Sequence, residues 1–323
     1  MTVNKIHLYN PNWGLRSRTG ARDHDNDDSC EYFEVERADG NGTIYIAIVA
    51  DGVTNTAGGA QASRIAVETV KATLQESPGR RETLSEWLEF SILQANEEIL
   101  FQAKRNPQWQ GMSTTIVLAA LAGEKLYVMH LGDSRAYLIR DKAIYQLVSD
   151  HTWAQEAIHT GILTSEEATQ HPGRNQLLRY LGAQKGLGVD RGIIVPGTTQ
   201  REEYLAAQPG DAVLLCSDGL HGRVSEAEIK QIVLEHVGYP QDAVDALIEK
   251  AVEKGERDDI TGVLFELPPG RKELPSDSDV TTPIAAPIPV KAKQSGPWLW
   301  MLLALVGALT VAAILLIWLN VGQ

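Results

Sequence analysis

Aspartates at the ends of apolar segments are the residues whose type and spacing could do chemistry in this sequence. Residues 44–50 form a short apolar run rich in β-branched side chains, which predicts a buried strand that delivers Asp51 at its end. Gly52 follows, and without a side chain its backbone carbonyl can approach whatever Asp51 binds. A carboxylate at the mouth of a core strand is costly to bury unless it is paired or bound to a metal. A single Asp-Gly pair, however, is more often only a turn.

The same arrangement recurs, and the recurrence favours a metal site over a set of turns. Three further apolar segments carry an aspartate at one end, and an acidic cluster lies at residues 23–28. Carboxylates that converge repel one another and raise one another's pKa, and divalent cations relieve that repulsion. Oxygen ligands without a His/Cys set favour Mg²⁺ or Mn²⁺ over Zn²⁺. The candidate carboxylates are Asp51, Asp133, Asp218, the pair Asp258 and Asp259, and the acidic cluster around Asp28.

The composition excludes several classes of protein. The formal net charge of the 323 residues is −13, whereas a nucleic-acid-binding protein needs a basic face. The two cysteines, Cys30 and Cys216, have no metal-like spacing and give no disulfide framework, which favours a reducing compartment. Cys216 lies within an apolar segment, so we expect a buried thiol. The first 20 residues contain no apolar stretch typical of a secretory signal.

The spacing of apolar residues and the short connections predict an α+β fold, in which helices cover antiparallel sheets. Residues 10–20 are expected to form an irregular lead-in, and residues 150–205 a flap-like excursion from the sheet with two short helices. The helices are predicted at residues 61–75, 81–104, 153–160, 165–170, 226–237 and 242–253. Hairpins are predicted over residues 116–130 and 136–147, and further strands over 211–217 and 261–267.

The C-terminal part of the chain predicts a linker and a membrane anchor. Residues 268–297 are rich in Pro, Ser, Asp, Thr and Lys without periodicity, which is typical of a disordered linker. Residues 298–319 contain no charged side chain and are long enough to cross a bilayer as a helix, with tryptophans at both ends. Lys291 and Lys293 precede this span, so the catalytic domain over residues 1–267 is expected in the cytoplasm. A buried core helix is the alternative interpretation of the span.

Eight short segments, taken together, resemble the metal-dependent protein phosphatases of the 2C type (PPM) in their bacterial form. They occur in family order and cover about residues 18–267. Each segment alone is weakly specific, but the ordered set is strong. The segments are Asn26-Asp27-Asp28-Ser29, Val49-Ala50-Asp51-Gly52, Gly111-Met112-Ser113-Thr114-Thr115, Leu131-Gly132-Asp133-Ser134-Arg135, Asp150-His151-Thr152, His171-Pro172-Gly173-Arg174-Asn175, Ser217-Asp218-Gly219-Leu220 and Arg257-Asp258-Asp259-Ile260-Thr261.

The resemblance implies two packed antiparallel sheets flanked by helices, with a dinuclear Mn²⁺ or Mg²⁺ centre between them. It implies hydrolysis of phosphoserine and phosphothreonine in proteins by a hydroxide activated at that centre. Asp51 would bridge both ions and the Gly52 carbonyl would add a ligand. Asp218 and Asp258 would hold one ion, and Asp28 the other, partly through water. Asp133 matches the residue that holds a third, weaker metal in bacterial members.

The sequence departs from the family pattern at several positions. The phosphate-binding Arg of the family stands five positions before the residue matched by Asp28, where this chain has Asp23; Arg22, one residue earlier, is the candidate phosphate clamp. Val53 occupies the place of a His proposed as general acid in eukaryotic members, so leaving-group protonation would come from a metal-bound water or the substrate. Two milder changes are Asp259 for the usual Asn and Ser113 for a usual Gly. We interpret His24 as a surface residue.

The leading hypothesis is therefore a membrane-tethered Ser/Thr protein phosphatase that opposes a Ser/Thr kinase by acting on its phosphorylated substrates. One alternative is a catalytically weak phosphoprotein-binding module of the same fold, which the shifted Arg22 motivates. The metal aspartates count against that alternative, because a binding module gains nothing from so costly a charge cluster. A metal-dependent phosphoesterase for small molecules shares the chemistry and differs only in substrate.

Overall fold

The computed structural model describes residues 10–21, 25–37, 42–53, 58–76, 83–182 and 187–268. The chain divides into two units after Gly270, and all described residues belong to the first unit. The predicted span 298–319 and nearly all of the predicted linker lie outside the described residues. None of the helices in the described ranges is long and apolar enough to cross a membrane.

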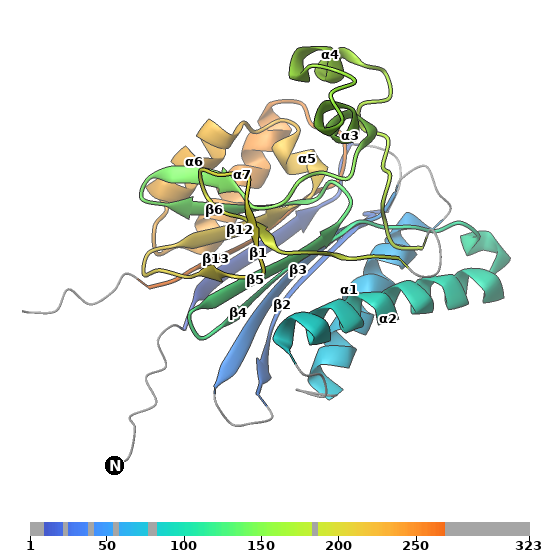
Figure 1. Cartoon of the computed structure of the whole chain (residues 1–323), viewed down its shortest axis with the longest axis horizontal. Helices are drawn as coiled ribbons and strands as arrows, with labels where there is room; N and C mark the ends of the chain where they lie inside the picture. Colours follow the sequence, from blue (N-terminus) through green and yellow to red (C-terminus); the bar gives the residue numbers. More distant parts are fainter. Residues whose placement is uncertain are drawn as a thin grey trace, which may run out of the picture. The chain divides into compact units, whose positions relative to one another are not determined.

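Two antiparallel sheets form the centre of this unit (Figure 1). One sheet has the strand order β1-β13-β12-β6-β7 and the other the order β11-β5-β4-β3-β2, with β8 also paired to β5. The short strands β9 and β10 pair with each other. The strands are β1 Asn12–Arg18, β2 Asp28–Glu36, β3 Thr43–Asp51, β4 Ile116–Ala122, β5 Lys125–Leu131, β6 Arg135–Arg140, β7 Ala143–Gln146, β8 Asp190–Arg191, β9 Ile193–Ile194, β10 Arg201–Glu202, β11 Leu205–Ala206, β12 Ala212–Cys216 and β13 Ile260–Glu266.

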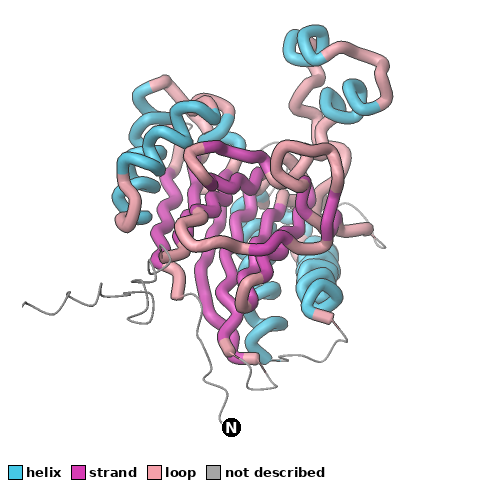
Figure 2. The backbone as a smooth tube through the Cα atoms, turned by 60° about the vertical axis from the view of Figure 1, so that its left-hand side comes forward, coloured by secondary structure: helices cyan, strands magenta, loops and turns pink. Residues whose placement is uncertain are grey.

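Helices cover the outer face of each sheet, so the unit has four layers (Figures 1 and 2). Helices α1 and α2 pack on β3 and β4 through one apolar cluster. Helices α5, α6 and α7 pack on β12 and β13 through another. The helices are α1 Gly59–Glu76, α2 Leu84–Arg105, the 3₁₀ turn η1 Pro107–Trp109, α3 Trp153–His159, α4 Ser165–Gln170, α5 Asp218–His221, α6 Glu226–Glu235 and α7 Pro240–Glu253. The predicted α+β architecture of two packed antiparallel sheets flanked by helices is confirmed.

The alternation of side chains along β3 explains why its sequence is apolar throughout. Ile44, Ile46 and Ile48 face α1 and α2. Ala47 and Val49 lie on the other face, within the cluster that joins the two sheets. Successive side chains of a strand point to opposite faces, so a strand covered on both sides loses the usual polar alternation. Small residues on the inner face also let the two sheets approach closely.

Capping side chains fix the first residues of helices α2 and α6. Thr83 caps α2 and Ser225 caps α6, and in each case a Glu three residues later returns a hydrogen bond to the cap backbone. These reciprocal bonds satisfy amide groups that the first helical turn would leave unpaired. Two of the long predicted helices are thus confirmed, with starts fixed by side chains rather than by apolar spacing alone.

The prediction of an irregular segment at residues 10–20 is wrong, because residues 12–18 form the edge strand β1 paired along its whole length with β13. The segment is polar because Arg16 pairs with Asp245 and Glu249 of α7 instead of entering the core. Gly14 lets α7 approach, since a Cβ there would lie 2.4 Å from the backbone of Gln241. Edge strands that carry charges and glycine escape detection by apolar patterning.

The excursion predicted over residues 150–205 is shorter in the structure. Helices α3 and α4 do project from the sheets, and we call residues 153–175 the flap (Figure 1). The chain is back against the sheets by Leu181, which bridges to Thr114, and β8 then pairs with β5. Two-residue strands carry too little sequence pattern to be predicted.

We expect Ile46→Ala to lower the free energy of unfolding by about 2–5 kcal/mol, because it leaves a cavity between the sheet and α1–α2. Ile46 is fully buried. Chemical denaturation of the two proteins would measure the change. The same substitution at Ile162, which is 69% exposed, is the matched control and should change stability by no more than about 0.5 kcal/mol. Equal losses in both variants would contradict the layer assignment.

Candidate metal centre

Two aspartates face each other at the end of one strand pair. In the β2–β3 ladder Asp28 lies directly opposite Asp51. Like charges at directly opposed positions destabilise a sheet, so this pairing needs a physical reason. Asp28 is buried, and one of its oxygens, Oδ2, accepts a hydrogen bond from Ser217 Oγ at 2.8 Å. Its other oxygen, Oδ1, is buried without a hydrogen-bond partner among the described residues.

The other predicted carboxylates converge on this pair from separate elements. Asp133 follows β5, Asp218 opens α5 directly after β12, and Asp258 precedes β13. These three line one cleft of about 630 Å³. Repulsion from Asp28, Asp218, Asp133 and Asp258 contributes to the raised pKa of Asp51. The structure therefore brings all five predicted aspartates together, while their role as metal ligands stays a prediction.

Burial and mutual repulsion strongly perturb this acidic centre. Desolvation, and then repulsion from Asp218 and Asp259, raise the pKa of Asp28 to about 7, against hydrogen bonds from Thr261 and Ser217 that lower it. Desolvation and repulsion from Asp218 and Asp150 raise the pKa of Asp133 to about 8. The pKa of Asp51 is raised well above its ordinary value, first by desolvation. A cluster that resists ionisation, with an unpartnered buried oxygen, has the donor set and the charge that hard divalent cations require.

The backbone of Asp51 and Gly52 is held from two sides. Thr114 Oγ1 donates to the Asp51 carbonyl at 2.8 Å, and Asp51 N donates to Thr115 Oγ1 at 3.0 Å. These threonines explain the segment at residues 111–115 that the sequence singled out. Gly52 has no space for a side chain, because a Cβ would lie 2.4 Å from the backbone of Gly59. The close approach expected at Gly52 is thus present, and its carbonyl as a ligand stays a prediction.

The loop that carries Asp133 is fixed by His151. The His151 N–H donates to the Gly132 carbonyl at 2.9 Å, and the Gly132 N–H donates to His151 Nδ1 at 3.1 Å. His151 Nε2 in turn lies 3.1 Å from Asp190 Oδ2 and 3.2 Å from Arg179 Nη1. This pair of bonds holds the residue directly before Asp133, and it accounts for the Asp150-His151-Thr152 segment.

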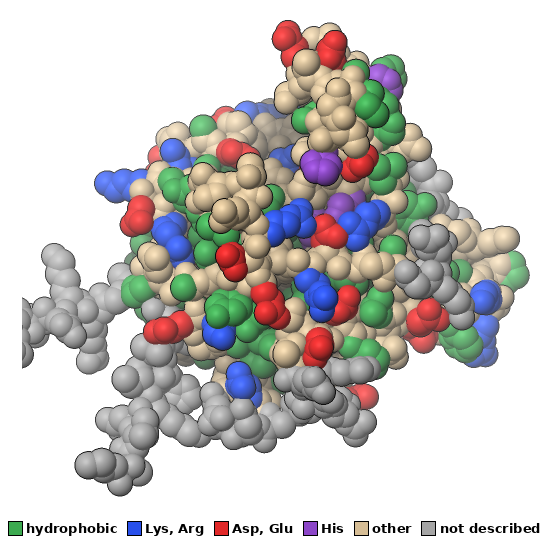
Figure 3. All heavy atoms as spheres, in the orientation of Figure 1, with side chains coloured by type: hydrophobic (Ala, Val, Ile, Leu, Met, Phe, Trp, Pro, Cys, Tyr) green, Lys and Arg blue, Asp and Glu red, His purple; other side chains and the backbone are tan. Residues whose placement is uncertain are grey.

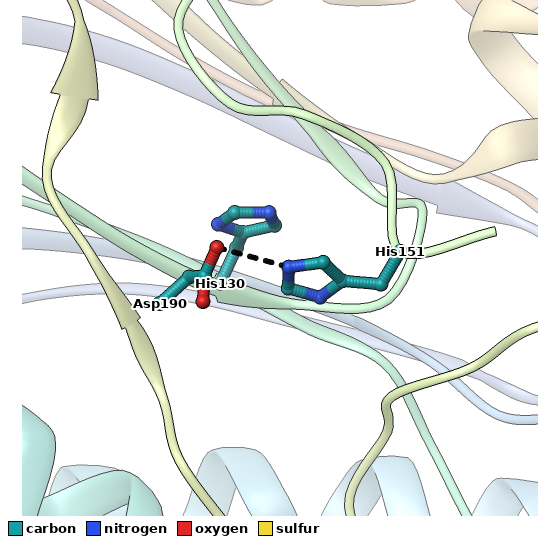
Figure 4. Close-up of side chains that lie close together, drawn as sticks. All are labelled: His130, His151 and Asp190. Carbon is teal, nitrogen blue, oxygen red and sulfur yellow. Dashed lines mark hydrogen bonds and ion pairs between the residues drawn. The ribbon is translucent and has the colours of Figure 1, made fainter. Parts of the chain in front are cut away.

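A second group of metal-type side chains lies beside that loop (Figure 4). His130, His151 and Asp190 place one ligand atom each within 4.8 Å of one another. The two rings are stacked, with centroids 4.3 Å apart and an angle of 17° between their planes. A metal ion lies near the plane of each imidazole that binds it, and stacked planes do not converge on one ion. Asp190 is also neutralised by Arg179 and Arg201, so we interpret this group as an ion-pair network.

The cleft beside the acidic centre also carries basic groups. Arg135 binds Asp150 through Nε and Nη2, and Arg223 pairs with Glu256, so both charges are already balanced. Arg174 reaches the cleft from the flap. Figure 3 shows histidine, basic and acidic side chains gathered below the flap. Arg22 and His24 lie outside the described residues.

Several residues around the centre were not recognised from the sequence as part of it. The Asp27 side chain accepts from Ala60 N at the start of α1, at 2.9 Å. Ser217 and Thr261 lie against Asp28, and Asp259 accepts two backbone N–H groups. Asp27 and Asp259 are aspartates directly beside the predicted ligands Asp28 and Asp258. This proximity was the signal in the sequence that could have pointed to them. Which aspartate faces the cleft and which faces the backbone depends on contacts between distant segments.

Comparison with known proteins identifies the family. A sequence profile described as "Protein phosphatase 2C" matches residues 19–250. The chain belongs to the protein phosphatase 2C family. It is 34% identical to the serine/threonine phosphatase stp of Listeria innocua over 254 residues, which are 78% of this chain and 94% of that protein. It is 32% identical to the serine/threonine protein phosphatase PstP of Mycobacterium tuberculosis over 237 residues, which are 72% of this chain and 43% of that protein.

Solved 2C phosphatase structures share the fold. The PstP catalytic domain, crystallised in complex with two manganese ions, has a TM-score of 0.64 and 28% identity, covering 80% of this chain and 98% of that one. The predicted enzyme class is confirmed, and this 2C family member is a serine/threonine protein phosphatase.

We expect the metal-free protein to lose stability as the pH rises from about 6.5 to 8. Asp28 and Asp133, with folded pKa values of about 7 and about 8, bind protons that the unfolded chain has released. An unfolded Asp titrates near about 3.9 and an unfolded His near about 6.5, so in this interval the carboxylates dominate. Thermal unfolding in EDTA at the two pH values measures the effect.

Asp51→Asn serves as the comparison for that measurement. It removes one charge from the cluster and should flatten the pH dependence. Mn²⁺ added at pH 8 should raise the unfolding temperature of the parent protein, because an ion that binds only the folded state stabilises it by mass action. A parent protein whose metal-free stability is unchanged over this interval would contradict the convergence of the carboxylates.

Proposed function

We propose that Asp28, Asp51, Asp218 and Asp258, with the Gly52 carbonyl, hold two divalent ions of Mn²⁺ or Mg²⁺. Asp133, which lines the same cleft, would hold a third ion. The observation that carries this proposal is the placement of Asp28 opposite Asp51, with Asp28 Oδ1 buried and unpartnered among the described residues. Two facing carboxylates, one buried and one half-buried, destabilise the fold unless their charge is compensated, and a bound cation would compensate it.

Different residues of the cleft have different roles in phosphate-monoester hydrolysis. Divalent ions bound there lower the pKa of a water molecule and neutralise charge on the transferring phosphoryl group. Arg174 supplies a cation from the flap for the phosphoprotein, and Arg22 is the proposed phosphate clamp. His221 lies in the cleft and contacts the Asp133 carbonyl through Nε2 at 3.0 Å. Burial lowers the pKa of His221 to about 4, so it is neutral at pH 7 and positions the Asp133 loop rather than donating a proton.

The substrates we propose are proteins phosphorylated by a Ser/Thr kinase at the membrane. The relatives are serine/threonine phosphatases, which supports this substrate class, and the open cleft below the flap has room for a protein segment. Residues 298–319 then tether the enzyme by a single span, with the phosphatase domain in the cytoplasm. The membrane span rests on its uncharged sequence and the lysines before it.

Asp51→Asn should abolish Mn²⁺-dependent hydrolysis of a phosphothreonine peptide. Residues that only support a metal ligand cost up to about 100-fold in activity when they are changed. We expect a larger loss of rate here, because Asp51 is proposed to bind the ions directly. Release of inorganic phosphate by the full-length protein measures it. Asp141→Asn, the same change in a surface turn, should leave the rate unaltered.

Two outcomes of that assay would reject the proposal. Activity that survives both EDTA and Asp51→Asn rejects the metal mechanism. Phosphopeptide binding without turnover, equal with and without Mn²⁺, favours the phosphoprotein-binding alternative. A higher rate on a small phosphate ester than on a phosphoprotein would instead favour a small-molecule phosphoesterase.

The tether can be tested independently of catalysis. The full-length protein expressed in bacteria should sediment with membranes and resist extraction at alkaline pH. Replacing Leu305 and Ile314 together by Arg should release it, because each charge at the centre of a span costs about 2.5–3.5 kcal/mol on insertion scales. Leu305→Val with Ile314→Val is the matched control and should stay in the membrane fraction. An unsubstituted protein found in the soluble fraction would overturn the tether.

A further inference from the structure

We propose that Asp259 is a positioning residue, which holds the backbones of Gly20 and Asp27 and thereby fixes Asp28 and Gly52 for cation binding. Its carboxylate bonds to both of these backbones, and we call this arrangement the Asp259 clamp. The inference rests on the proposed function for its link to metal, while the clamp itself can be tested without any metal.

The clamp consists of two short hydrogen bonds to backbone groups. Gly20 N donates to Asp259 Oδ1 at 2.7 Å, and Asp27 N donates to Asp259 Oδ2 at 2.6 Å. Asp259 is 3% exposed, so water does not compete strongly for its oxygens. Hydrogen bonds from N–H groups to an ionised carboxylate are shorter and stronger than those between neutral groups.

The Gly20 end of the clamp is also fixed by packing. Ala21 N donates to the Arg257 carbonyl at 2.9 Å. A Cβ at Gly20 would lie 2.2 Å from that same carbonyl oxygen, so only glycine allows the two backbones to come so close. Gly20 is thereby held against Arg257, two positions before Asp259.

The Asp27 end leads into the metal centre. The Asp27 carbonyl accepts from Gly52 N at 3.0 Å, and its side chain accepts from Ala60 N at 2.9 Å. The next residue along the chain is Asp28. A shift of Asp27 would therefore displace a carboxylate ligand on one side and the Gly52 carbonyl on the other.

The negative charge of Asp259 repels that of Asp28, and the hydrogen bonds of the clamp explain why a carboxylate is nevertheless present. Repulsion from Asp259 contributes to raising the pKa of Asp28, so a further carboxylate here opposes ionisation of the centre. An Asn of the same shape would remove that repulsion, but it offers one oxygen and one NH₂ group. Its NH₂ would face one of the two backbone N–H donors, and that donor would lose its partner. In this chain the carboxylate of Asp259 accepts from both donors at once.

The experiment compares Asp259→Asn with the parent full-length protein. Calorimetric titration with Mn²⁺ should give a dissociation constant about 10-fold higher in the variant, the lower end of the range for outer-shell partners of metal ligands. The kcat at saturating Mn²⁺ should be largely retained, because the ligands themselves are intact. In the metal-free state, hydrogen exchange at the Gly20 and Asp27 amides should accelerate by about tenfold or more.

Asp211→Asn is the matched control. Asp211 is also a buried carboxylate that accepts a backbone N–H, from Gln208, and it lies at the end of β12 away from the acidic centre. This variant should lose stability without a change in Mn²⁺ affinity. Asp259→Ala replaces Asp259→Asn in the comparison if the latter does not fold.

The outcomes separate the clamp from the proposed metal centre. Unchanged exchange at both amides overturns the clamp. Faster exchange with unchanged Mn²⁺ affinity, or an equal loss of affinity in Asp211→Asn, overturns its positioning role. A parent protein that binds no Mn²⁺ overturns the metal centre and with it the link to Asp28 and Gly52, while the exchange data still decide the clamp.

Discussion

Electrostatic repulsion between Asp28 and Asp51 is the constraint on which the rest of this structure depends. The ladder of β2 and β3 places the two carboxylates opposite each other, and β3 cannot slip by one residue without exchanging its two apolar faces. The repulsion therefore cannot relax by a change of register. The energy that holds it in place comes from burial of β3 between α1–α2 and the second sheet.

The surroundings of this pair serve to hold backbone groups rather than to add charge. Thr114 and Thr115 fix the backbone of Asp51, and His151 fixes the residue before Asp133. The Asp259 clamp does the same for the segment that ends at Asp28. The carboxylates are thus supported mainly through main-chain contacts from several separate segments, and Asp28 Oδ1 is left without a hydrogen-bond partner among the described residues.

The sequence predicts the parts of the fold that depend on local pattern. A continuous apolar run rich in β-branched residues predicts strand β3, and the helical spacing of apolar residues predicts helices α1, α2 and α7. Strand β1 was not, because Arg16 and Arg18 pair with α7 at an exposed edge. The five aspartates of the centre were predicted from repetition and family resemblance. The roles of Asp27 and Asp259 were not, because the bond between them joins residues that lie 232 positions apart.

The two-sheet design has a consequence for how this enzyme can be divided. Asp28 and Asp51 come from one sheet, Asp218 and Asp258 flank strands of the other, and Asp133 lies where the chain crosses between them. Strand β1, from the N-terminal end, completes the sheet built mainly by the C-terminal half. No cut between β3 and β12 yields a fragment that retains all five aspartates of the acidic centre. Gene fragments or split reporters made from this phosphatase must therefore reassemble both halves before the acidic centre can form again.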